Sequence, residues 1–129
     1  MARRERLAGR EINYTKDNFF VDTNILVYAY DSSAGKKWET SSKILSQLWT
    51  HQTGVVSTQV LQELYVGLTR KVRIPVSAEK AKEIVFDLLR WPLVINNGEH
   101  ILHAIDLQRK HRFSFWDSLI IQAAVASKS

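Results

Sequence analysis

Three short apolar runs, each followed by a segment of helical periodicity, constrain the fold of this chain more than any other feature. The runs begin at Asn18, Gly54 and Leu93. Short strands that are apolar throughout are typical of a sheet buried on both faces. Parallel neighbours in such a sheet need crossover connections, which are usually helices. The sequence therefore predicts an α/β fold with a short parallel β-sheet flanked by α-helices.

The segments that follow the runs predict the helices. Asp22 is a good N-cap for a short helix that includes Ile25–Tyr30, so we prefer a helix there to a longer strand. Further helices are expected over 36–49, 58–72, 77–90 and 99–111, and again after Ser114. In the helix over 99–111, the apolar residues expected to face inward are Ile101, Leu102, Ala104 and Ile105.

Composition excludes several classes of protein. The chain has 129 residues, which suits one domain, and it has no cysteine, so disulfides, thiolate metal sites and cysteine nucleophiles are excluded. No apolar run approaches the roughly 20 residues that span a bilayer, and the N-terminus lacks the apolar segment of a secretory signal. We therefore expect a cytoplasmic protein that does not insert into membranes.

Positive charge is concentrated at the N-terminus. The net charge is +5, and the four arginines and one glutamate of residues 1–10 contribute +3 of it. Short charged termini are usually solvated, although such a segment can also contact phosphates. We divide the chain into a basic, flexible arm over residues 1–17 and a folded domain over residues 18–129.

Three acidic residues fall near strand ends or helix starts. Asp22 closes the first run, Glu63 lies one turn into the helix after the second, and Asp117 lies in the first turn of the last helix. In a parallel sheet these places converge on one edge. Clustered carboxylates repel one another, and a hard cation such as Mg²⁺ or Mn²⁺ removes that penalty. The pattern predicts a metal site for phosphodiester hydrolysis, in which Thr23 or Asn24 supports Asp22.

Each acid also has an ordinary structural interpretation. Asp22 can act as a helix cap, Glu63 can be an exposed helix residue, and Ser114 with Asp117 matches the S-x-x-D capping pattern. The joint placement of the three acids favours the metal site.

The segments around these acids resemble the PIN-domain family, especially bacterial toxins of the VapC group. The resemblance rests on Phe20–Tyr28, Gln62–Tyr65 and Phe115–Ile120 and spans residues 18–127. It implies an endoribonuclease that depends on Mg²⁺ or Mn²⁺, is often neutralised by a partner antitoxin protein and often forms a homodimer. Residue by residue, it assigns the catalytic, metal-binding positions to Asp22, Glu63 and Asp117, with Thr23, Asn24 and Ser118 as supports.

The sequence departs from the family pattern at its end. Family members usually continue past the helix that contains Asp117 into another strand and a fourth acidic residue, and this sequence ends at Ser129 before either. The resemblance is therefore to a C-terminally truncated domain. We expect an uncovered strand edge, which favours dimerisation. The alternative function is a catalytically impaired PIN-like remnant that acts as a dimerisation, antitoxin-binding or RNA-binding module.

Two basic clusters are candidates for RNA contact. They comprise Arg70, Lys71, Arg73, Arg109, Lys110 and Arg112. Cations at these places can bind phosphates, or they can complement the negative ends of helices, and both interpretations stay open.

Overall fold

The computed structural model describes residues 4–5, 12–13 and 17–127. Near the N-terminus, β1 (Arg4–Glu5) pairs antiparallel with β2 (Ile12–Asn13). Apart from these strands and Asp17, the predicted flexible arm over residues 1–17 lies outside the described residues. The other elements are β3 (Phe19–Phe20), α1 (Thr23–Tyr30), the 3₁₀ turn η1 (Ser32–Ala34), α2 (Lys36–His51), β4 (Gly54–Ser57), α3 (Thr58–Val66), the π-helical turn η2 (Gly67–Lys71), α4 (Ala78–Leu88), β5 (Leu93–Val94), α5 (Gly98–His111) and α6 (Phe115–Ala126).

The sheet has the predicted parallel form. Its strand order is β3-β4-β5, with Phe19 opposite Gly54 and Val56 opposite Leu93. All four residues of the central strand β4 are buried. Among the described residues, β3 pairs only with β4, so one edge of this sheet carries no further strand. The carboxyl end of β3 leads through Val21 to Asp22, and that of β4 leads directly into α3, which carries Glu63.

The first residue of β4 is a glycine, and the ring of Trp91 packs directly against its backbone. A Cβ atom at this position would lie 2.5 Å from a carbon of the Trp91 ring, closer than packed atoms approach. Trp91 is buried, and its ring meets that of Trp49 edge to face with 5.2 Å between centroids. The absence of a side chain at Gly54 thus allows this aromatic pair to close the end of the core.

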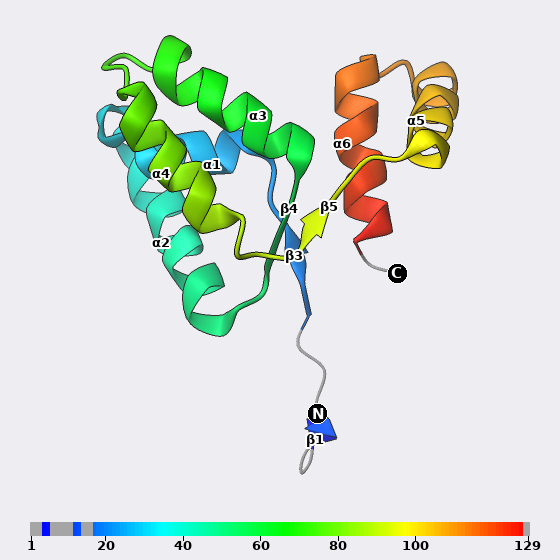
Figure 1. The fold of residues 1–129 in the computed structure, drawn as a ribbon, viewed down its shortest axis with the longest axis horizontal. Helices are drawn as coiled ribbons and strands as arrows, with labels where there is room; N and C mark the ends of the chain where they lie inside the picture. The colour runs from blue at the N-terminus through cyan, green and yellow to red at the C-terminus, as the bar shows by residue number, and fades with distance from the viewer. Residues whose placement is uncertain (1–3, 6–11, 14–16, 128–129) are drawn as a thin grey trace.

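One hydrophobic core lies among the sheet and helices α1 to α4. Figure 1 shows these helices to one side of the sheet and the α5–α6 pair to the other. The fully buried side chains of this core include Leu26, Val56, Leu64 and Leu88. Asp22 and Ser114 cap α1 and α6 as the sequence predicts, and the side chains of Ser57, Ser77 and Asn97 cap α3, α4 and α5.

The predicted inward face of α5 is wrong except at Ala104. Ala104 is fully buried, whereas Leu102 is 62% exposed, and Ile101 and Ile105 are also exposed. The reason is that α5 packs against α6, and contact with a single neighbouring helix covers only a narrow strip of its surface.

Within the described part of the chain, no helix is both long enough and apolar enough to span a membrane.

Candidate active site

The three predicted acids line one cavity of about 550 Å³. Its walls come from three parts of the chain, namely α1 with its cap, the continuous segment α3–η2, and α6. The lining residues are Asp22, Thr23, Asn24, Val27, Gln62, Glu63, Val66, Gly67, Lys71, Asp117 and Ile120. Asp22 and Asp117 are exposed and Glu63 is partly buried, so all three are in reach of a solvent-borne ligand.

Asp22 serves as a helix cap and also lines the cavity. Its Oδ1 accepts a hydrogen bond of 2.6 Å from the backbone N–H of Thr23. Because a carboxylate has a second oxygen and spare lone pairs, the cap leaves acceptor capacity on Asp22. Asn24 lines the same cavity from the next position.

Glu63 is held at both carboxylate oxygens. Thr23 Oγ1 donates to Glu63 Oε1 at 2.8 Å, and Gln59 Nε2 donates to Glu63 Oε2 at 3.0 Å. Thr23 is a buried side chain of α1, so its bond joins α1 to α3 across the cavity wall. The structure therefore places Thr23 against Glu63 as well as beside Asp22.

Asp117 is presented by the first turn of α6. Its backbone N–H donates to Ser114 Oγ at 3.0 Å, so the S-x-x-D pattern is a helix cap here. The carboxylate of Asp117 has no hydrogen-bond or ion-pair partner among the residues that the structure describes. Ser118 is buried, and its Oγ donates to the Ser114 carbonyl at 2.9 Å. Ser118 thus stabilises the turn that carries Asp117 and does not line the cavity.

Gln59 is the residue of this site that the sequence interpretation missed. Its amide contacts Glu63 and also donates to the Trp116 carbonyl at 3.1 Å. The available signal was its position four residues before Glu63, which puts both side chains on one face of α3.

Of the six basic residues proposed for RNA contact, Lys71 alone lines the cavity. Arg70 precedes it in η2, and Arg109 and Lys110 lie in the last turn of α5. Arg112 follows as the C-cap of α5 with a φ of 61°. The helix-end interpretation suits the α5 cluster, because positive charge there complements the helix dipole.

The oxygen donors fit a hard divalent cation in their chemistry. Three carboxylates line one cavity, and none of them is in an ion pair with a residue that the structure describes. In residues 17–127 and the two short N-terminal strands, no three Asp, Glu or His side chains are grouped closely enough to hold a metal together. Mg²⁺ usually keeps several waters and takes one or two carboxylates directly, so the cavity suits an ion bound partly through water.

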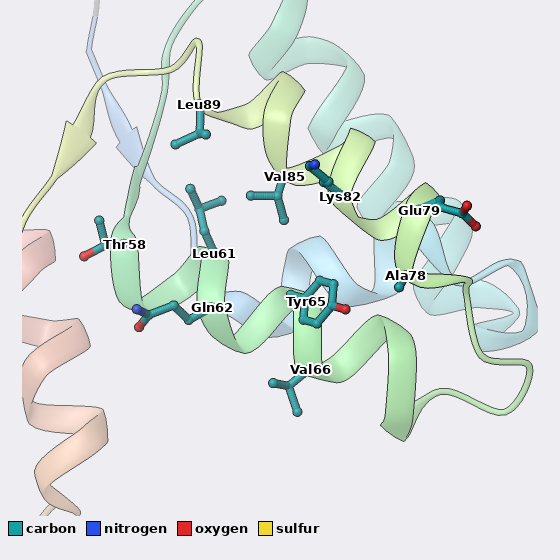
Figure 2. Close-up of a pocket in the computed structure, with 10 residues that line it drawn as sticks. All are labelled: Thr58, Leu61, Gln62, Tyr65, Val66, Ala78, Glu79, Lys82, Val85 and Leu89. Atoms are coloured by element: carbon teal, nitrogen blue, oxygen red, sulfur yellow. The ribbon is translucent and has the colours of Figure 1, made fainter.

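A larger cavity lies elsewhere and does not contain the acids. It occupies the groove between α3 and α4 and measures about 710 Å³ (Figure 2). Leu61 of α3 and Val85 of α4 point into it, and Glu79 is its one acidic lining residue. Volume alone would favour this groove, but the groups able to act on a phosphodiester lie in the smaller cavity, and we base the candidate site on that chemistry.

Comparison with known proteins assigns the family. The family model described as "PIN domain" matches residues 19–129. A search of curated proteins found no match to this chain. The matched region includes the α/β domain and every residue that lines the acidic cavity. The chain therefore belongs to the PIN domain family, whose members are in general metal-dependent nucleases.

Proposed function

We propose that this protein is a Mg²⁺- or Mn²⁺-dependent endoribonuclease whose catalytic residues are Asp22, Glu63 and Asp117. The supporting observation is that three carboxylates from three separate segments line one cavity in a chain of the PIN family. RNA is the substrate class, and the phosphodiester bond is the group that is hydrolysed. The cytoplasm is the compartment in which we expect this activity.

The side chains of the site have two kinds of role, which are to bind the ion and to orient the residues that bind it. Asp22, Glu63 and Asp117 would hold the ion, and Thr23 and Gln59 orient Glu63 through their hydrogen bonds. A bound divalent ion makes water more acidic and neutralises charge on the phosphate. Hydrolysis forms a bond from a water oxygen to phosphorus and breaks one ester bond. The water gives up a proton and the departing oxygen gains one, so no oxidant or reductant is needed.

Lys71 is the basic residue that lines the acidic cavity, and it can offset the repulsion between the three carboxylates and an RNA phosphate. A phosphodiester that approaches three carboxylates is repelled, and a nearby ammonium group reduces that repulsion. The ammonium group of Lys71 makes no hydrogen bond or ion pair with the described residues, so its charge is available to a phosphate oxygen. We therefore retain Lys71 as the principal RNA contact of the site.

The test is cleavage of a fluorogenic single-stranded RNA with Mg²⁺ or Mn²⁺. We expect turnover that EDTA abolishes and that Asp22→Asn reduces by more than about 100-fold, because a metal ligand should matter more than the residues that support one. Asp106→Asn, which removes an exposed carboxylate of α5, is the matched control and should retain wild-type turnover. If folded protein shows no turnover with either metal, the nuclease proposal is wrong for this chain.

The proposal includes the finer role of a toxin that an antitoxin protein neutralises and that forms a homodimer. Its support is the resemblance of the three acidic segments to toxins of the VapC group. Light scattering after size exclusion tests the dimer, and growth arrest on expression, relieved by a co-expressed partner, tests the toxin. A dimer without RNA turnover would favour the alternative of a non-catalytic binding module.

A further inference from the structure

We propose that Gln59 is a positioning residue that ties the first turn of α6 to Glu63 and so keeps the acids of α3 and α6 in one site. This inference rests on the proposed function for its catalytic meaning. The link between α3 and α6 that it describes can be measured without RNA or metal.

The amide nitrogen of Gln59 bridges the two helices. Gln59 is buried, with 6% of its surface exposed. Its Nε2 donates to Glu63 Oε2 at 3.0 Å and to the Trp116 carbonyl at 3.1 Å. An amide nitrogen carries two hydrogens, so these two bonds use both of them. One group therefore contacts a candidate metal ligand and the residue that immediately precedes another.

The orientation of this amide follows from its partners. Both groups that face Nε2 are acceptors, so exchanging the nitrogen and oxygen of the amide would set oxygen against oxygen. The Oε1 atom is buried and accepts no hydrogen bond from the described residues. A buried acceptor without a donor is unfavourable. The two donated bonds hold the amide in this orientation. Their acceptors are Glu63, a residue of the candidate site, and the backbone carbonyl that precedes Asp117.

The position of Asp117 depends on how α6 attaches to the rest of the domain. The main partner of α6 is α5, and the buried Leu119 and Ala123 lie outside the main core cluster. Ile120 packs against that cluster at its margin. The Gln59 bond to Trp116 ties the N-terminal turn of α6, one residue from Asp117, directly to α3. Without this bond, we expect Asp117 to be less well placed relative to Glu63.

The experiment compares Gln59→Met with Ser57→Ala. Methionine keeps the length of the side chain and cannot donate. Ser57 is buried and caps α3 through a 3.1 Å bond from Val60 N, so its loss weakens the start of the same helix and removes no hydrogen bond to Glu63 or to the described residues of α6. The measurements are hydrogen exchange of residues 115–119, Mn²⁺ affinity without RNA, and turnover as a function of Mn²⁺ concentration.

For Gln59→Met we expect faster exchange in residues 115–119 and about tenfold weaker Mn²⁺ binding. RNA turnover by this variant should be recovered when more Mn²⁺ is added, and its KM for RNA should change little. Ser57→Ala should change none of these. If Gln59→Met and Ser57→Ala show the same hydrogen-exchange rates in residues 115–119 and the same Mn²⁺ affinity, the positioning role is overturned.

Two further outcomes are also decisive. If Gln59→Met does not fold, Gln59→Asn replaces it, because asparagine keeps the amide and is too short to reach both acceptors. The same faster exchange upholds the link, and wild-type exchange overturns it. If the wild-type protein binds no Mn²⁺ and cleaves no RNA, the nuclease proposal fails. In that case the exchange of α6 alone decides whether Gln59 joins the two helices.

Discussion

Replacing Lys71 by methionine should weaken RNA binding in a way that depends on salt. Lys71 stands at the end of η2 and lines the acidic cavity. The π-helical turn is closed by a 3.2 Å bond from Val72 N to the Gly67 carbonyl. Gly67 lies against α1, since a Cβ there would approach Val27 Cγ2 to 3.1 Å. Close packing of η2 on α1 therefore sets the direction from which the ammonium group reaches the cavity.

The expected magnitude follows from the loss of one phosphate contact. Each contact to a single strand contributes about 0.7 to the slope of log affinity against log salt concentration. Lys71→Met should reduce that slope by about 0.7, which makes the loss of affinity between about 50 and 200 mM salt smaller by roughly 2.6-fold. Arg70→Met is the matched control, because Arg70 is the exposed neighbour of Lys71 in η2 and does not line the cavity.

The assay is fluorescence anisotropy of a labelled single-stranded RNA in EDTA, where metal-dependent cleavage cannot interfere. With Mg²⁺ or Mn²⁺ present, the same variant should raise KM more than it lowers kcat, since the contact exists before the reaction starts. Equal salt slopes for wild type, Lys71→Met and Arg70→Met would refute the assignment of Lys71. Turnover that persists unchanged in Lys71→Met would leave the nuclease proposal standing without this contact.

Two further predictions concern stability. Thr23→Val removes the donor to Glu63 Oε1 and should lower the free energy of unfolding by about 1.5 kcal/mol, the low end for a bond to a charged group, because Glu63 is partly buried. Urea unfolding checks this, and a stability equal to wild type would contradict it. Burial, followed by the negative charge of Asp87, raises the pKa of Tyr30. The folded state thus holds the Tyr30 proton more tightly than the unfolded state does. The contribution of Tyr30 to the free energy of unfolding is therefore fully present below about pH 10 and is lost as pH rises through the raised pKa. Tyr30→Phe should remove that fall in urea unfolding between about pH 8 and pH 11, and an unchanged pH profile would show that another group causes it.

The sequence by itself determined the order and type of the elements in the domain. The apolar runs predicted the parallel strands, and the capping residues Asp22 and Ser114 predicted where two of the helices begin. These signals are local, because periodicity and caps depend on neighbouring residues along the chain. The general rule that strand ends share one edge of a parallel sheet was enough to expect Asp22 and Glu63 near each other.

The tertiary structure decided which side chains meet. Nothing in the local pattern distinguished Lys71 from Arg70, and only the folded structure, in which η2 lies against α1, shows that Lys71 lines the cavity. Nor did the pattern reveal that α5 packs on α6 and leaves Leu102 exposed. The bridge made by Gln59 also depends on where α6 docks. Apolar spacing shows that a helix has an inner face, but the neighbour that covers it is set by long-range packing, which no local window of sequence contains.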